Sequence, residues 1–233
     1  GAGQPELVTL DGPRVNVTTF DVVFPLLHGP HGEDGCVQGL LELVDAAYVG
    51  AGVAASAVGM DKELSRAVFG HAGLRQTEYL VVRRNAWNAD RAGIRSHIES
   101  TLRYPLFVKP VNLGSSIGIS KVHDSESLET AMDLAAGYDI KMMIETSVER
   151  ARELECAVLG NENPNASVIG EIIPGAEFYD YTTKYIDDRS QLIVPADLPE
   201  DTKTDIQEMA IAAFRAIDGA GLGRVDFLLS PSG

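Results

Sequence analysis

The chain has 233 residues, of which 45% are apolar and 23% are charged, so it can bury a core as one large or two to three small domains. Its formal net charge of −15 disfavours a polyphosphate backbone or an anionic membrane as partner, and we expect neither nucleic acid nor membrane binding. The two cysteines, Cys36 and Cys156, form no closely spaced pair, which argues against a zinc ribbon or disulfide framework and favours a reducing, cytoplasmic location.

The first part of the chain alternates between strand and helix patterns. Residues 21–27, DVVFPLL, predict a strand, and the turn-rich HGPHGEDG follows at 28–35. Apolar residues then recur at helical spacing over 37–44. A second short strand is predicted at 46–52. A helix of about three turns is predicted within 60–73, with Gly73 placed to cap its end.

The middle of the chain contains a glycine-rich hairpin. Residues 87–103 are polar with isolated apolar positions, and predict a surface connection with a helical piece. The stretch FVKPVNLGSSIGISK, 107–121, predicts an apolar strand, a turn of small residues and a second strand. An amphipathic helix then begins near Asp124 or Ser125 and stops at Gly137.

The second half predicts an antiparallel sheet with helices. Strands are expected at 141–145, 155–160 and 167–173, and the Asn and Pro content between the last two suits a hairpin connection. A long amphipathic helix is expected at 201–218 and a strand at 224–230. The chain thus combines two architectures, and a cleft between them is the expected ligand site.

The glycine-rich hairpin is suited to binding an anion. It lacks the P-loop pattern, because Lys109 precedes the glycines. The residues Gly114, Ser115, Ser116 and Gly118 offer backbone N–H groups and hydroxyls that can fold over an anion, and Lys109 at the base counters the same charge. The alternative is an ordinary hairpin with a solvated lysine.

Several separated stretches together resemble the D-alanine:D-alanine ligase family of the ATP-grasp fold. They are HGPHGEDG (28–35), YVGAGVAASAVGMDK (48–62), FVKPVNLGSSIGISK (107–121), MIETSVERARELECAVLG (143–160), FYDYTTKY (178–185) and GRVDFLL (223–229). Their order and spacing span nearly the whole chain.

The resemblance implies an α/β fold, α+β in the second half, with a parallel-sheet N-terminal portion followed by two antiparallel-sheet subdomains. The expected divisions are a partial N-terminal α/β domain at 1–59, a central ATP-grasp subdomain with the glycine-rich loop at 60–144, and a C-terminal subdomain, incomplete at its end, at 145–233.

The resemblance also implies which residues bind ATP phosphates. Lys62 and Lys109 match the two family lysines that contact them, and Ser115 and Ser116 lie in the glycine-rich loop that closes over the nucleotide. Lys184 matches a lysine near the γ-phosphate.

Two glutamates match the family positions that bind the nucleoside. Glu145 matches the hinge residue at adenine and ribose, and Glu153 matches the ribose-hydroxyl acceptor, with Glu155 left open as its alternative. The structural alternative for both Glu145 and Glu153 is a surface salt bridge with Arg150 or Arg152.

Further matches concern catalysis. Tyr185 matches the lid tyrosine bonded to Ser115, Arg224 matches the arginine that stabilises the oxyanion, and His28 matches the histidine near the substrate carboxylate. The alternative interpretation of His28 is that it only orders its own loop. Glu33 is expected to brace this network.

The implied reaction is ATP-dependent joining of two D-alanines through an acyl phosphate, for peptidoglycan precursor synthesis, by a homodimer. Asp226 matches the first ligand of Mg²⁺ or Mn²⁺. Tyr185 favours the dipeptide product over the ester of a D-alanine:D-lactate ligase, and a non-catalytic ATP-binding module is the other alternative. The family's GGxSxEHxVS segment and its E-x-N metal ligands are not in the sequence, so we expect a chain truncated at both ends with little turnover of its own.

Overall fold

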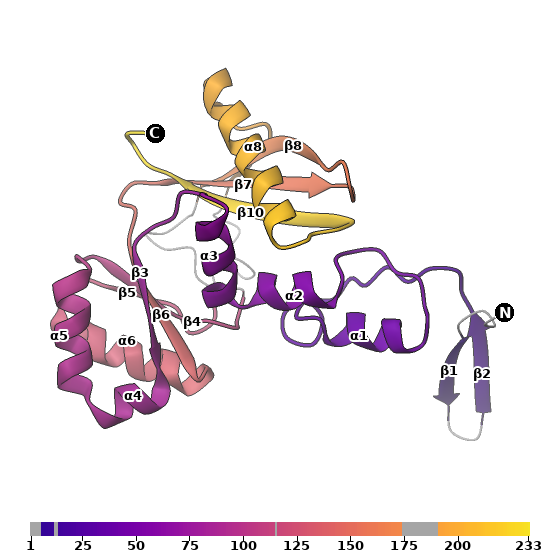
Figure 1. Ribbon diagram of the computed structural model, residues 1–233, viewed down its shortest axis with the longest axis horizontal. Helices are drawn as coiled ribbons and strands as arrows, with labels where there is room; N and C mark the ends of the chain where they lie inside the picture. The colour runs from indigo at the N-terminus through magenta and orange to yellow at the C-terminus, as the bar shows by residue number, and fades with distance from the viewer. Residues whose placement is uncertain (1–5, 12–13, 115, 174–190) are drawn as a thin grey trace.

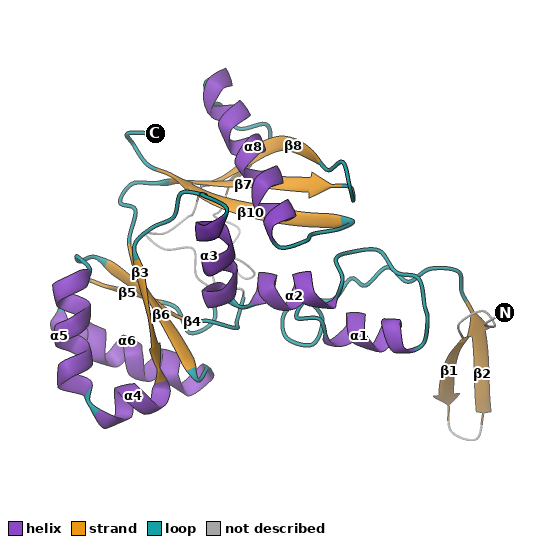
Figure 2. Ribbon diagram, in the orientation of Figure 1, coloured by secondary structure: helices purple, strands orange, loops and turns teal. Residues whose placement is uncertain are grey.

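The computed structural model describes residues 6–11, 14–114, 116–173 and 191–233. These residues form a two-stranded hairpin and two four-stranded antiparallel sheets, with helices packed on the sheets (Figures 1 and 2). The hairpin, β1 (Glu6–Asp11) and β2 (Arg14–Thr19), was not predicted and stands apart from both sheets at the N-terminal end (Figure 1). Within the described ranges, no helix is both long enough and apolar enough to cross a membrane.

The parallel pairing predicted near the N-terminus is present among the described residues, but only as a single bridge and not as extended strands. The segments at 21–27 and 46–52 meet only in one parallel bridge, between Val23 and Tyr48. The Val23 N–H donates to the Ala47 carbonyl at 2.9 Å, and the Val49 N–H donates to the Val23 carbonyl at 2.9 Å. Pro25 has no N–H to continue such a ladder, which explains why the run DVVFPLL forms no strand.

Three short helices lead from this region to the space between the two sheets (Figure 1). They are α1 (Cys36–Leu43), α2 (Val53–Met60) and α3 (Lys62–His71). The predictions of α1 and α3 are confirmed, whereas α2 was not predicted. Asp61 caps α3, because its carboxylate accepts hydrogen bonds from the N–H groups of Glu63 and Leu64 at 3.0 and 3.1 Å.

The central sheet has the strand order β3-β6-β4-β5. Its strands are β3 (Tyr79–Arg83), β4 (Leu106–Pro110), β5 (Ser120–Val122) and β6 (Lys141–Thr146). The predicted hairpin of β4 and β5 is confirmed, with Leu106 opposite Val122, and so is the strand β6. β3 was not predicted.

The helices α4 (Arg84–Ala89), α5 (Arg91–Thr101) and α6 (Ser125–Tyr138) pack with this sheet around one core. The prediction of α6 is confirmed. The helical piece predicted within 87–103 is confirmed by α5, but its description as a surface connection is wrong, because Trp87 and Ile98 are fully buried in that core. The Trp87 Nε1 donates to the Asp133 carboxylate at 2.8 Å, which satisfies the polar atom of the buried ring.

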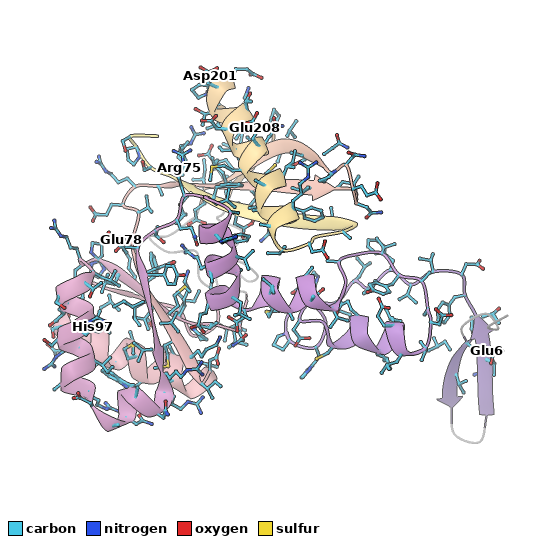
Figure 3. The ribbon with its side chains drawn as sticks, in the orientation of Figure 1. Glu6, Arg75, Glu78, His97, Asp201 and Glu208 are labelled. Atoms are coloured by element: carbon cyan, nitrogen blue, oxygen red, sulfur yellow. The ribbon has the colours of Figure 1, made fainter. Side chains whose placement is uncertain are left out.

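The C-terminal sheet has the strand order β10-β7-β8-β9. Its elements are β7 (Arg152–Leu159), β8 (Asn165–Ile173), β9 (Gln191–Ile193), α8 (Glu200–Ala216) and β10 (Leu222–Leu229). The hairpin of β7 and β8, the helix α8 and the strand β10 confirm the predictions. α8 is also adjacent to the end of α3, where the guanidinium of Arg75 lies 3.7 Å from the Met209 sulfur (Figure 3 labels Arg75).

Side-chain alternation gives the C-terminal sheet two different faces. Leu154, Cys156 and Val158 of β7 are buried in a core with α8. The intervening residues of β7 point to the opposite face, because successive side chains of a strand alternate. That face carries Glu153 and Glu155, and it is the face on which the candidate site lies.

Candidate nucleotide-binding and active site

Two lysines from distant parts of the sequence converge at the base of the glycine-rich turn. Lys62 is the first residue of α3, and its backbone N–H and its Nζ each lie 3.2 Å from the Val111 carbonyl just beyond β4. The Nζ also donates to the Leu113 carbonyl. Burial, and then the nearby charge of Lys109, lower the pKa of Lys62 to about 8. The predicted pair of phosphate lysines is therefore brought together.

Glu145, at the end of β6, is the counter-charge of this pair. Its side chain is 8% exposed, and its two carboxylate oxygens contact the Lys109 ammonium and the Arg66 guanidinium. The alternative of a surface salt bridge is wrong for Glu145. Arg66 was missed by the sequence analysis, although its position one turn after Lys62 on α3 places both on one helix face.

The glycine-rich turn is anchored at its base. The Asp139 carboxylate accepts hydrogen bonds from the Asn112 backbone N–H at 2.7 Å and from its side-chain amide at 3.0 Å. Burial acts to raise the pKa of Asp139, but hydrogen bonds led by that of the Asn112 N–H outweigh it and lower the pKa. Gly118 has φ of +71°, and a Cβ there would lie 2.7 Å from the Tyr138 ring, so only glycine fits. Ser116 lies in this turn with φ of +58°.

A second buried ion cluster fixes the start of α3. The Lys141 Nζ, from β6, contacts Asp61 at 2.6 Å and Glu63 at 2.7 Å. These acids flank Lys62 in the sequence, so Lys141 holds the backbone on either side of that lysine. Sequence reasoning missed Lys141, because a lysine within an apolar strand gives no signal of its distant partners.

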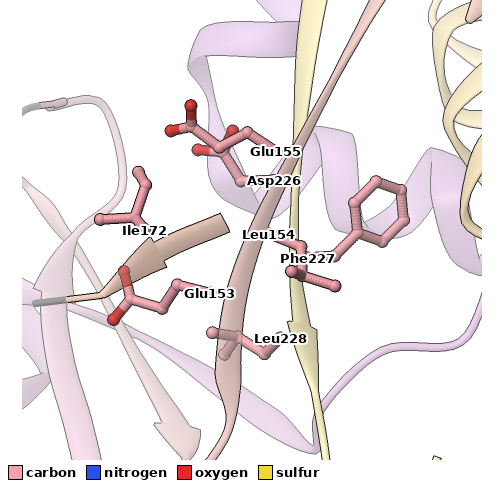
Figure 4. Close-up of a pocket in the computed structure, with 7 residues that line it drawn as sticks. All are labelled: Glu153, Leu154, Glu155, Ile172, Asp226, Phe227 and Leu228. Atoms are coloured by element: carbon pink, nitrogen blue, oxygen red, sulfur yellow. The ribbon is translucent and has the colours of Figure 1, made fainter. Parts of the chain in front are cut away.

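The other half of the site lies on the C-terminal sheet, where β7 and β10 run side by side. Asp226 stands directly opposite Glu155 in their register. The Arg224 Nε lies 2.8 Å from Asp226, and its terminal nitrogen lies 3.4 Å from Glu155. Figure 4 shows the two carboxylates together. They line a pocket of about 120 Å³ with Glu153, whose carboxylate lies apart from them, and with Ile172.

The N-terminal loop reaches this arginine. The pKa of the Arg224 guanidinium is raised, first by its hydrogen bonds with Asp226 and in smaller part by the charge of Glu33. The Glu33 N–H donates to the Gly29 carbonyl at 3.0 Å, which closes the loop as a turn. His28 lies in the same loop with an exposed side chain. The predicted residues Ser115, Lys184 and Tyr185 fall outside the described residues.

The donor set on β7 and β10 fits a hard divalent cation. Glu155 and Asp226 present carboxylate oxygens, which are the ligands that Mg²⁺ prefers, and they face each other across one strand pair. In this structure the Arg224 guanidinium neutralises both carboxylates. The prediction that Asp226 is a metal ligand stays a prediction, and Glu155 is its nearest acidic neighbour across the strand pair.

The fold class is defined by two antiparallel sheets. One carries the glycine-rich hairpin, where Lys109 of β4 and Lys62 of α3 converge, and the other carries the acidic cluster. The chain has the ATP-grasp fold. It aligns with the VanG D-Ala:D-Ser ligase from Enterococcus faecalis with a TM-score of 0.83 and 35% identity, over 94% of this chain and 62% of that chain. The D-alanine-D-alanine ligase from Coxiella burnetii aligns with a TM-score of 0.81 and 35% identity, over 98% of this chain and 62% of that chain.

Sequence comparison identifies the family. The family described as "D-ala D-ala ligase C-terminus" matches residues 68–233, and "D-ala D-ala ligase N-terminus" matches residues 5–51. The chain belongs to the D-alanine:D-alanine ligase family.

Curated relatives have about half of their aligned residues in common with this chain. It is 53% identical over 210 residues to the D-alanine--D-alanine ligase of Acetivibrio thermocellus, covering 90% of this chain and 56% of the relative. It is 52% identical over 214 residues to that of Bacillus cytotoxicus, covering 92% and 59%. The chain therefore spans less than two thirds of the length of these relatives.

Proposed function

We propose that the protein to which these residues belong joins two D-alanines to D-alanyl-D-alanine with hydrolysis of ATP to ADP and phosphate, for peptidoglycan precursor synthesis. The observation that carries the proposal is the convergence of Lys62 and Lys109 at the base of the glycine-rich turn. Family membership supplies the substrates, because the curated relatives are named as D-alanine--D-alanine ligases.

The lysine pair binds the phosphates of ATP. Two ammonium groups buried close together repel each other, and Glu145 compensates only part of their charge because it is shared with Arg66. A polyphosphate placed over the turn supplies the missing negative charge. Ser115 and Ser116 of the turn, Glu145 and Glu153 at the nucleoside, and Lys184 at the γ-phosphate complete the proposed nucleotide site.

The acidic cluster serves the transfer step. Glu155 and Asp226 would hold Mg²⁺, whose chemistry there is to neutralise phosphate oxygens during transfer. Arg224 then stabilises the oxyanion that forms when the second D-alanine amine attacks the acyl phosphate. An acyl phosphate is needed because a free carboxylate is too electron-rich to be attacked by an amine.

The remaining assignments belong to the same proposal. As the family resemblance implies, we assign to Tyr185 and Ser115 the closing of the site against water, and to His28 and Glu33 the positioning of the first D-alanine. We retain the proposed divisions at 1–59, 60–144 and 145–233, although β6 crosses the second boundary by two residues. The assembly is a cytoplasmic homodimer.

The test is phosphate release from ATP by the whole protein, with D-alanine as the varied substrate and dipeptide detected by mass spectrometry. We expect release that depends on D-alanine, and a fall in kcat/KM of about 100-fold or more in Arg224→Met, the usual effect of removing one oxyanion donor. D-Lactate and D-serine are offered as second substrates. ATP binding without release under any of these substrates would favour the non-catalytic module and contradict the proposal.

A further inference from the structure

A cluster of three metal-ligating side chains lies on the N-terminal loop, beside the proposed active site. The imidazole of His31, the carboxylate of Asp34 and the thiol of Cys36 each offer one ligand atom, and these atoms all lie within 4.8 Å of one another. Among the described residues, this is the one group of three or more His, Cys, Asp or Glu side chains with such spacing. None of the three is used in the proposed ligase reaction.

The loop brings these groups together through its own hydrogen bonds. One oxygen of Asp34 accepts from the His31 backbone N–H at 2.7 Å, and the other accepts from the Cys36 N–H at 3.0 Å. His31 has φ of +68°, a backbone conformation that few side chains adopt, and it turns the chain so that its ring meets residues three and five positions later. The carboxylate is thus held in place before any ion arrives.

The backbone of the loop is also held by contacts with Leu27 and with Gln38 of α1. Gly32 is buried, and a Cβ there would lie 2.6 Å from the Leu27 Cβ, so the backbone packs too closely for any other residue. The buried side chain of Gln38, on α1, donates from Nε2 to the Gly32 carbonyl at 3.1 Å. A ligand set on such a supported loop requires little ordering when an ion binds.

We propose that His31, Asp34 and Cys36 bind a borderline-soft divalent metal ion of the Zn²⁺ class. One nitrogen, one oxygen and one sulfur donor suit Zn²⁺, and a water completes four ligands because the cluster is open to solvent. Mg²⁺ does not compete, since it prefers an all-oxygen ligand set. On binding, the Cys36 thiol releases its proton to solvent and the sulfur forms the bond to the ion.

The site has a consequence for the neighbouring chemistry. Glu33 lies between the ligands in the sequence, and its charge acts on Arg224. A bound ion would hold the loop at His31 and Cys36, and thereby restrain the backbone that carries Glu33. The metal site does not depend on the proposed ligase activity, because its ligands are read from the loop alone.

Co²⁺ titration of the metal-free protein in excess Mg²⁺ tests the site. Co²⁺ bonded to a thiolate gives charge-transfer absorption in the near ultraviolet, which carboxylate ligands on β7 and β10 cannot give. We expect this band to saturate at one Co²⁺ per chain and to disappear when Zn²⁺ is added. Absence of a thiolate band overturns the proposal.

Variants assign the ligands. Cys36→Ser abolishes the band. His31→Gln weakens binding by at least about tenfold, because losing even a group that hydrogen-bonds to a metal ligand has an effect of this size. His71→Gln, at an exposed histidine of α3, is the control and leaves binding unchanged. A band that persists in Cys36→Ser would overturn the assignment.

Thiol reactivity gives a second measurement on the unmodified protein. Cys36 is exposed and Cys156 is fully buried, so an aromatic disulfide reagent modifies Cys36 first. Zn²⁺ should slow this modification by at least about tenfold, because a metal-bound sulfur is no longer a free nucleophile. An unchanged rate at saturating Zn²⁺ would contradict the site, whatever the outcome of ligase assays.

Discussion

The charge of Lys109 acts on the Lys62 ammonium at the base of the glycine-rich turn, and the pKa of Lys62 is lowered to about 8, first by burial and then by this charge. The carboxylates of Glu145, Asp139 and Asp61 act in the opposite direction without cancelling the shift. A site that holds two cations at this cost is incomplete without an anion.

Nucleotide binding should be coupled to proton uptake. At pH 8 about half of the Lys62 amines are neutral, and a bound triphosphate restores the charged form, so binding takes up about half a proton. Calorimetry in buffers of different ionisation enthalpy measures this number. Lys62→Arg, which stays charged, should bind ATP with no uptake at pH 8. Equal uptake in both proteins would show that another group titrates.

The same shift fixes the sign of the pH dependence of stability. Without nucleotide, the unfolded chain keeps the Lys62 proton up to about pH 10.5, whereas the folded chain releases it near pH 8. This group therefore makes the free energy of unfolding rise with pH between those values.

Glu145→Gln should destabilise the apo protein and make it sensitive to anions. The change leaves Lys109 and Arg66 facing each other without their buried counter-charge, at a cost of about 3 kcal/mol. Tripolyphosphate, which has no base or ribose, should raise the melting temperature of this variant more than that of wild type. Glu171→Gln is the control, since its carboxylate is nearly as buried as that of Glu145 but pairs with the more exposed Arg152 away from the lysines. Equal anion rescue of the two variants would argue against a phosphate site at the lysines.

Gly118→Ala should disrupt the glycine-rich turn. The residue has φ of +71°, and its new Cβ would lie 2.7 Å from the Tyr138 ring and 2.9 Å from Pro110. We expect a loss of about 1–2 kcal/mol in the free energy of unfolding from the backbone alone, together with weaker ATP binding. Gly114→Ala is the matched control, because a Cβ there meets no atom within 4 Å. Denaturant unfolding of both variants decides whether the close approach at Gly118 matters.

Lys141→Met should act on ATP binding without touching ATP. It leaves the buried Asp61 and the partly exposed Glu63 without their shared cation, at a cost of about 3 kcal/mol that comes mainly from Asp61, and loosens the start of α3 where Lys62 lies. Lys203→Met, which removes an exposed pair with Glu200, should cost less than about 0.5 kcal/mol and leave the Kd for ATP unchanged. If Lys141→Met lowers stability but not ATP affinity, Lys141 is not a positioning residue.

Local patterns predicted the elements whose neighbours are close in sequence. The hairpin of β4 and β5, the hairpin of β7 and β8, and the helix α8 follow from alternation, turn composition and helical periodicity. The parallel strands predicted at 21–27 and 46–52 are reduced to one bridge, because Pro25 interrupts the pairing that the apolar run favours. β3 was missed, although its run of Leu80, Val81 and Val82 is a usable strand signal.

The site was less accessible to pattern reasoning than the fold. Lys62 at a helix start gives no local sign of its function, and only the resemblance to the family selected it. Its position depends on α3 docking against the end of β4, a contact between residues far apart in the chain. Arg66 and Lys141 were missed for the same reason. Arg66 pairs with Glu145 and Lys141 pairs with Asp61, and tertiary packing alone brings these partners together.

The most direct test of the shared phosphate site is lysine acylation measured by mass spectrometry, with and without saturating MgATP. A neutral amine is the reactive form, so the lowered pKa of Lys62 should make it react below the pH at which ordinary lysines do. We predict that MgATP slows labelling of both Lys62 and Lys109 by at least about tenfold, while Lys203 on α8 is unaffected. Unchanged labelling of Lys62 and Lys109 under conditions where ATP is bound would contradict the account.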